Sequence, residues 1–148
     1  MLDLDTLTGR IGEEIGRGEW LQIDQQRVDA FADATLDHQW IHQAGPEAAA
    51  GPFGGPIVHG FLTLSLLWHL TGSTPDLVEG AAMVVNYGLD KVRFISPVPV
   101  GSRVRAVVVL KDVRPVDGGA RITNSVTIEL EGSERPAAYV EAITRVYA

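Results

Sequence analysis

Two residues with acid–base side chains stand close together about a quarter of the way along the chain. Asp37 and His42 are five residues apart, in a segment with no regular helical or strand pattern. A loop can bring both side chains to one point, whereas a strand would place them on opposite faces. A carboxylate beside an imidazole can act as a general acid–base pair. The spacing also fits a simpler interpretation, in which Asp37 caps a turn and His42 packs against Trp40.

A second candidate site is the pair His59-Gly60, which begins an apolar run. The first N–H groups of a helix lack internal partners and lie at the positive end of its dipole. A glycine lets a ligand approach that backbone, so the Gly60 N–H is suited to bind an oxygen that gains negative charge. Together with Asp37 and His42, this group would suit the addition of water to a double bond next to a carbonyl. The alternative is that Gly60 serves close packing and that His59 is hydrogen-bonded locally.

Other chemistries find less support in the residues. His38 and His42 have the spacing of a helical metal pair, but no third ligand suggests itself, and we expect no metal. The glycine-rich run 52–56 lacks the Gly-Lys-Ser/Thr ending of a phosphate loop. The chain has no cysteine, which excludes disulfides and thiolate catalysis.

The bulk composition describes an ordinary globular chain. Its 148 residues fit a single domain over 1–148, and 45% of them are hydrophobic. The net charge of −7 gives no footprint for nucleic acid. No apolar run is long enough to span a membrane, and the acidic N-terminus does not resemble a signal peptide. These features predict a cytoplasmic protein.

The hydrophobic pattern predicts the elements that position the candidate residues. Asp24 is a suitable N-cap for a helix over 25–35. Residues 36–59 read as mostly loop, with one helical turn at 46–50. Residues 60–71 are apolar on nearly every side, which predicts one helix that is buried on most sides.

The remaining elements are predicted to be strands. Short turns between consecutive strands imply an antiparallel sheet. One long helix before such a sheet favours an α+β domain in which the sheet wraps around the helix. The predicted strand regions are 12–23, 83–95, 103–114, 121–131 and 137–147.

Taken together, these features resemble the MaoC-like (R)-specific enoyl-CoA hydratases, especially the branch named after nodulation protein N. The hydratase signature of that family runs Gly-Asp-x-Asn-Pro-hydrophobic-His, then five residues and a small one. Here Leu36 to His42, then Ala48, take those places. The run from Gly54 to Leu62 is similar to the family's loop into its central helix.

The resemblance continues into the second half of the chain. Residues 86–94, Asn-Tyr-Gly-Leu-Asp-Lys-Val-Arg-Phe, and 97–101, Pro-Val-Pro-Val-Gly, look like the family's next strand and its exit. In all, the resemblance covers about residues 15–147. It implies the hot-dog fold, an antiparallel sheet wrapped around a long central helix. It also implies a homodimer that binds acyl-CoA near the subunit interface.

The resemblance also implies a reaction and its residues. Asp37 and His42 take the catalytic positions, and Gly60 takes the position whose N–H binds the thioester oxygen. The reaction would be reversible, (R)-specific hydration of a trans-2-enoyl-CoA thioester. It needs no cofactor, because the thioester itself makes C3 electrophilic. We further expect the substrate to contact Gln39, Trp40, Phe53, His59 and Tyr87.

Three positions depart from the family pattern. Gln39-Trp40 replace Asn-Pro, and Leu36 stands where the family usually has glycine. A leucine would be strained there if the position requires a positive φ. Trp68 stands where some members have a small polar residue, which would change the shape of the acyl pocket.

Two rival functions remain on the sequence alone. A hot-dog thioesterase would have a similar shape, but several of its branches place a carboxylate on the central helix, and residues 60–71 contain no Asp or Glu. A non-catalytic acyl-CoA-binding domain is the second rival, and the departures at Leu36 and Trp40 keep it open.

Overall fold

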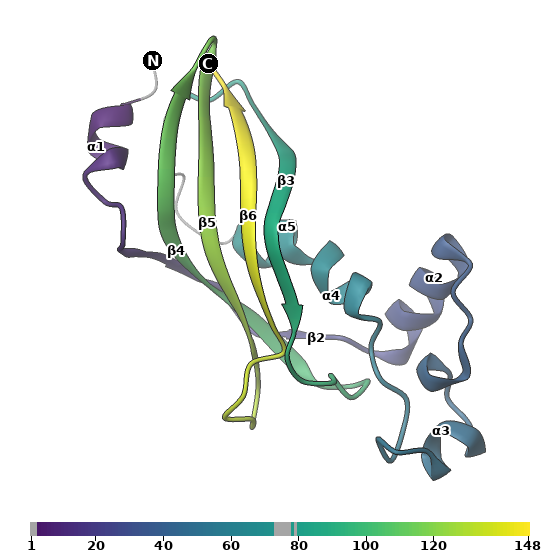
Figure 1. The fold of residues 1–148 in the computed structure, drawn as a ribbon. Helices are drawn as coiled ribbons and strands as arrows, with labels where there is room; N and C mark the ends of the chain where they lie inside the picture. The colour runs from purple at the N-terminus through teal and green to yellow at the C-terminus, as the bar shows by residue number, and fades with distance from the viewer. Residues whose placement is uncertain (1–2, 73–77, 79) are drawn as a thin grey trace.

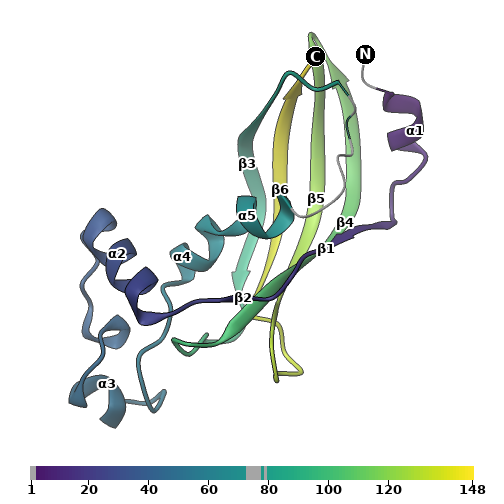
Figure 2. The ribbon, with the colours of Figure 1, turned by 180° about the vertical axis from the view of Figure 1, so that it is seen from behind.

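The structure is a computed structural model that describes residues 3–72, 78 and 80–148. In chain order the elements are α1 (Leu4–Thr8), β1 (Glu14–Arg17), β2 (Leu21–Gln22), α2 (Gln25–Thr35), η1 (Trp40–His42), α3 (Pro46–Ala50), α4 (Gly60–Ser65), α5 (Leu67–Gly72), β3 (Met83–Phe94), β4 (Arg103–Val116), β5 (Gly119–Leu130) and β6 (Ala138–Tyr147). A long, curved antiparallel sheet carries α4 and α5 on one face, α1 lies beside β4, and α2 and α3 extend away from the sheet (Figures 1 and 2).

Every strand pairing in the sheet is antiparallel, as the sequence predicts. The strand order is β1-β4-β5-β6-β3, and β2 pairs with another part of β4. After β3 the chain crosses to β4, and β6 later pairs with β3, so that β3 forms one edge of the sheet. The central helix lies across one face of the sheet (Figure 2), and α5 contacts β4.

The core lies between the inner face of the sheet and the helices. The alternation predicted for residues 121–131 is confirmed, because Ile122, Val126 and Ile128 are buried on β5. Leu62 of α4 and Leu70 of α5 belong to the same buried cluster. Inward residues of β4 and β6 also belong to it, among them Val104, Ala106, Val108, Leu110, Ala138, Val140 and Val146.

Helix α2 begins and ends as its sequence directs. The Asp24 side chain accepts a hydrogen bond from the Arg27 N–H at 2.9 Å, which confirms the predicted N-cap. The helix ends at Leu36, which has φ 62° and ψ 27° in the left-handed region. The turn lets the Asp37 N–H bond to the Ala32 carbonyl at 3.1 Å. A leucine therefore occupies a conformation that usually selects glycine.

The central helix differs from its prediction. It forms two short helices end to end, α4 and α5, interrupted at Leu66. The prediction that it is buried on most sides is wrong, because Phe61 is 68% exposed and Trp68 is 54% exposed. The physical reason is geometric: within one chain the sheet covers only one side of the helix.

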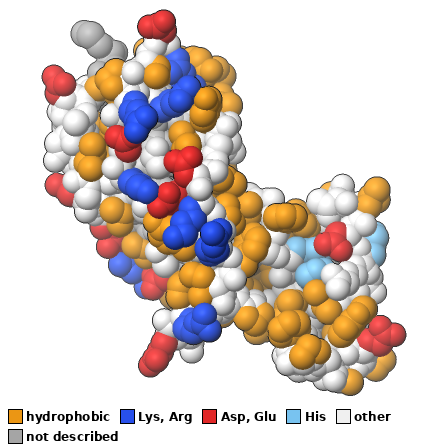
Figure 3. Space-filling model, in the orientation of Figure 1, with side chains coloured by type: hydrophobic (Ala, Val, Ile, Leu, Met, Phe, Trp, Pro, Cys, Tyr) orange, Lys and Arg blue, Asp and Glu red, His pale blue; other side chains and the backbone are white. Residues whose placement is uncertain are grey.

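The edge strand β3 leaves a second apolar surface uncovered. Met83, Val85, Tyr87 and Leu89 are all exposed large hydrophobic side chains on this strand. Figure 3 shows hydrophobic side chains gathered on the face where the sheet meets the helical part of the molecule. Among the described residues, no helix is both long enough and apolar enough to cross a membrane.

The conformation of Leu36 gives a prediction about stability. Its side chain is 83% exposed, so a smaller residue removes little packing. Leu36→Gly should raise the free energy of unfolding by about 0.5–1 kcal/mol, because relief of left-handed strain exceeds the entropy cost of glycine. Urea unfolding measures this change. Leu36→Ala is the matched control, since it keeps the Cβ and should bring no gain; an equal gain in both variants would contradict the strain argument.

Candidate active site

The segment between α2 and α4 carries the candidate residues, and hydrogen bonds hold its two limbs together. The N–H of Ile57 bonds to the carbonyl of Ile41 at 2.8 Å. The carbonyl of Ile57 in turn lies 2.7 Å from Nδ1 of His42. One side-chain bond and one backbone bond thus join residues that are about 15 positions apart. This pairing fixes where η1 lies relative to the start of α4.

Asp37 lies at the turn that follows α2. The left-handed Leu36 redirects the chain, and the carboxylate oxygen Oδ1 of Asp37 accepts a bond from the Gln39 N–H at 3.3 Å. The side chain is 49% exposed. The carboxylate is therefore held by its own loop and still open to water.

His42 is buried, and its geometry determines its tautomer. A carbonyl oxygen can only accept a hydrogen bond, so Nδ1 of His42 must carry the hydrogen that it donates to Ile57. In the neutral ring, Nε2 then has a free lone pair. This neutral tautomer is the form that a general base requires.

His59 packs directly on His42. Their ring centroids are 3.7 Å apart with an interplanar angle of 23°, which is a stacked arrangement. Nε2 of His59 lies 3.1 Å from the backbone carbonyl of Asp37 and 3.9 Å from its Oδ2. The carbonyl again requires a donor, so the hydrogen of His59 is on Nε2.

The structure therefore brings Asp37 and His42 to one place, as predicted. Ligand atoms of Asp37, His42 and His59 all lie within 4.8 Å of one another. Such a group can be considered for a metal, but Nε2 of His59 points its hydrogen at a carbonyl, which leaves only the buried Nδ1 of that ring with a lone pair. His38, the other residue of the considered metal pair, lies 3.6 Å from Asp33 on α2. The donor set favours acid–base chemistry, and the expectation of no metal stays a prediction.

Gly60 is the first residue of α4, directly after His59. A Cβ built at Gly60 would lie 3.1 Å from the Phe94 ring, so close packing is one reason for the glycine. Within the described part of the chain, no hydrogen-bond acceptor is found for the Gly60 N–H. Both sequence interpretations of this glycine, packing and a free N–H, are thus compatible with the geometry.

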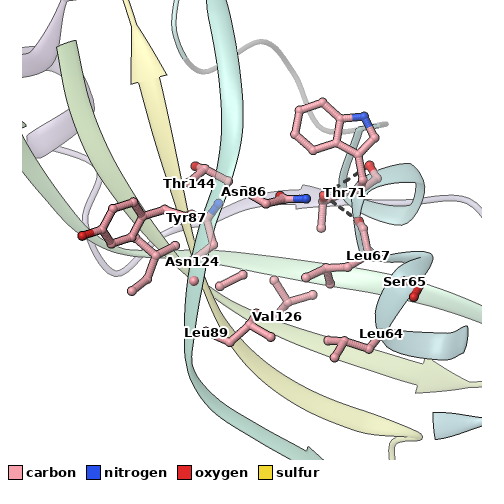
Figure 4. A pocket seen from close by; sticks show the side chains of 14 residues that line it. Leu64, Ser65, Leu67, Thr71, Asn86, Tyr87, Leu89, Asn124, Val126 and Thr144 are labelled. Atoms are coloured by element: carbon pink, nitrogen blue, oxygen red, sulfur yellow. Dashed lines mark hydrogen bonds between the residues drawn. The ribbon is translucent and has the colours of Figure 1, made fainter. Parts of the chain in front are cut away.

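The remaining predicted substrate contacts fall in different places. Trp40 packs on Gly51, whose built Cβ would lie 3.0 Å from the indole. Phe53 is exposed in the loop before α4. The Tyr87 ring points away from the helix, and the Arg121 guanidinium lies 4.2 Å from its centroid (Figure 4). Tyr87 is one of the residues that line the pocket described below, and it does not belong to the group formed by Asp37, His42 and His59.

A pocket lies along α4 and α5, between these helices and the sheet (Figure 4). It has a volume of about 360 Å³. Leu64, Leu67 and Trp68 line it from the helix, while Asn86, Asn124 and Val126 line it from the sheet. Sequence reasoning missed Asn86, Asn124 and the Ile57 carbonyl. A main-chain carbonyl has no sequence signal, and the two asparagines gave no pattern that marks a pocket.

Comparisons with known proteins identify the family to which the chain belongs. Residues 6–131 match the family described as MaoC like domain. The 3-hydroxyacyl-thioester dehydratase Z of Mycobacterium tuberculosis (strain ATCC 25618 / H37Rv) is 50% identical over 143 residues, which cover 96% of this chain and 94% of the relative. Nodulation protein N of Rhizobium leguminosarum bv. viciae is 48% identical over 146 residues, covering 97% and 90%.

A solved structure shares the fold. The (R)-hydratase from A. caviae involved in PHA biosynthesis superimposes with a TM-score of 0.73 at 29% identity, and covers 91% of this chain and 95% of that one. The predicted hot-dog fold is confirmed. The chain belongs to the MaoC-like family, as its sequence predicts.

The hydrogen bonds of the two stacked rings predict opposite tautomers. At a pH where both imidazoles are neutral, His42 should be protonated at Nδ1 and His59 at Nε2. A ¹H–¹⁵N correlation spectrum of the imidazole nitrogens distinguishes the two forms. His69, which is exposed on α5, serves as a reference for a ring free to exchange between them. The same tautomer in both rings would contradict the geometry.

Proposed function

We propose that this protein catalyses the reversible, (R)-specific addition of water to trans-2-enoyl thioesters. At the level of class, the prediction of a hydratase or dehydratase enzyme is confirmed by relatives named for these activities. The single observation that carries the finer proposal is the contact of Asp37, His42 and His59 beside the start of α4. Water addition requires a base and an acid, and a neutral imidazole with a free nitrogen beside a carboxyl group can supply both.

The proposed mechanism uses His42 as base and Asp37 as acid. Nε2 of His42 takes a proton from water while the oxygen bonds to C3 of the substrate. The electrons of the double bond move toward the carbonyl, and Asp37, which must enter this step as a protonated carboxyl group, delivers its proton to C2 and becomes a carboxylate. A proton then returns from His42 to Asp37, whose ligand atoms lie within 4.8 Å of each other. Dehydration is the same sequence in reverse.

The charge that develops on the thioester oxygen needs a donor. In this proposal the N–H of Gly60 binds that oxygen, since it begins α4 and points to no other acceptor among the described residues. An amide aimed at a developing oxyanion lowers the barrier most where water is excluded. No cofactor is required, because the thioester carbonyl polarises the double bond.

The pocket along the helix is the proposed site of the acyl chain. Leu64 is four residues beyond Gly60, which places it about 6 Å further along the helix axis. If the thioester carbonyl is bound by the Gly60 N–H, the acyl chain of the substrate therefore reaches the pocket after a few carbon atoms. Trp68 lines the pocket, so its bulk sets part of the available length.

The uncovered apolar surfaces support a homodimer. β3 is a 12-residue edge strand with exposed hydrophobic side chains, and Phe61 and Trp68 of the central helix are exposed beside it. An edge strand can pair with its own copy about a two-fold axis, which satisfies both free edges at once. We propose that β3 pairs with the β3 of a second subunit in the cytoplasm, with acyl-CoA bound near the interface.

Loss of either acid–base group should abolish most of the activity. Asp37→Asn and His42→Ala should each lower kcat about a hundredfold or more, because each removes a proton-transfer group. Loss of absorbance of short enoyl-CoAs measures the rate, and chiral analysis of the product should give the (R)-alcohol. Asp33→Asn and His69→Ala, both exposed, are matched controls that should keep full activity.

The same assay separates the rival functions. Near-wild-type hydration by folded Asp37→Asn or His42→Ala would refute the assignment, and an (S) product would refute the proposed stereochemistry. Free thiol released from a saturated acyl-CoA would identify a thioesterase. Binding of enoyl-CoA without hydration by the wild type would identify a non-catalytic domain.

A charge on the edge strand should break the proposed dimer. Leu89→Arg places a cation near the middle of β3, where burial against a second copy would leave it unpaired. Sedimentation should show a dimer for the wild type and a monomer for the variant. Ile11→Arg, an exposed apolar position outside β3, is the control and should stay dimeric. A wild type that sediments as a monomer would contradict the dimer.

A further inference from the structure

His59 is enclosed more completely than a substrate-binding side chain would be. It is 2% exposed, and the Phe31 ring lies 5.0 Å from it on one side while His42 stacks on another. We propose that His59 is a positioning residue: it holds Asp37 and His42 in working geometry and does not touch the substrate. This inference rests on the proposed hydratase function and assigns His59 a role different from the predicted substrate contact.

The first contact positions Asp37. Nε2–H of His59 donates to the Asp37 carbonyl at 3.1 Å across 22 residues of sequence. Asp37 follows a strained turn at Leu36, on a stretch with no regular structure. The hydrogen bond from His59 to the main chain of Asp37 therefore restrains the position of this residue without using the oxygen atoms of its carboxylate. The carboxylate oxygens stay available to water and to the substrate.

The second contact positions His42. Its hydrogen bond to Ile57 fixes one nitrogen but leaves the ring able to turn about that bond. Stacking on His59 at 3.7 Å fixes the plane of the ring as well. When His42 takes a proton from water, the cation that forms lies over a neutral aromatic face, which stabilises it.

The free nitrogen of His59 argues against a proton-transfer role. Nδ1 is buried and has no hydrogen-bond partner in the described part of the structure. A proton on Nδ1 would find no hydrogen-bond acceptor among the described residues, so the geometry offers no path for a proton through this nitrogen. The ring is therefore suited to hold its neighbours and not to carry protons. As the residue before Gly60, it also links both side chains to the head of α4.

Three substitutions separate the two contacts. His59→Gln can keep a donor near the position of Nε2 but loses the ring, His59→Phe keeps a ring but loses the donor, and His59→Leu loses both. We expect kcat to fall about tenfold in the first two and about a hundredfold in the third, with KM within about threefold of wild type. His69→Leu, on the exposed side of α5, is the control and should retain wild-type kcat.

A double-mutant cycle tests whether His59 acts through Asp37. In an Asp37→Asn background, His59→Phe should cost much less than its tenfold effect in the wild type, because the side chain it positions no longer works. Affinity for a saturated acyl-CoA and the thermal midpoint of unfolding should change little in His59→Gln and His59→Phe. A purely structural role would lower these in parallel with kcat.

The outcomes are distinguishable. Suppose that the wild type is an active hydratase. The positioning role alone would then be overturned if His59→Gln and His59→Phe kept wild-type kcat. It would also be overturned if His59→Phe lowered kcat by the full tenfold in the Asp37→Asn background. The positioning role would also be overturned if kcat fell only in proportion to a lower thermal midpoint of unfolding or a weaker affinity for the saturated acyl-CoA. A wild type with no hydratase activity would overturn the proposed function and this role together.

Discussion

The pairing of the two limbs of the segment between α2 and α4 is the constraint on which the site depends. This segment has little regular structure of its own, so its conformational freedom must be offset by contacts at its ends. The backbone bond between Ile57 and Ile41 and the bond from His42 to Ile57 join those ends. His59 adds a third link, to Asp37. The catalytic groups are therefore also part of what holds their own loop in place.

The same arrangement explains why two departures from the family motif are tolerated. Leu36 adopts the left-handed conformation at the cost of some strain, and the turn still directs the Asp37 N–H to Ala32. Trp40 takes up the space over Gly51, so its bulk is accommodated by a neighbouring glycine. Neither departure separates Asp37 from His59 or His42.

A single chain leaves its central helix and edge strand incompletely covered. Phe61 and Trp68 are exposed because the sheet covers only one side of the helix. The exposed hydrophobic side chains of β3 add to this apolar surface. A second copy would cover that surface and lie next to the pocket along α4 and α5. Dimerisation and formation of the acyl site are thus coupled in the proposed function.

The sequence by itself determined what depends on local patterns. The Asp24 cap, the α2 helix, the turn at 46–50 and the inward residues of β5 follow from short-range periodicity and capping, and the motif around Asp37 and His42 indicates the family. It left open whether Asp37 and His42 meet, because spacing does not define the path of a loop.

Only the tertiary structure decided the contacts between distant parts of the chain. The stacking of His59 on His42, the Ile57 carbonyl that selects a tautomer, and the turning of Tyr87 toward Arg121 depend on how the segments pack. The exposure of Phe61 and Trp68 was mispredicted for the same reason. An apolar pattern shows that a surface needs cover, but which chain provides the cover depends on the packing of whole elements.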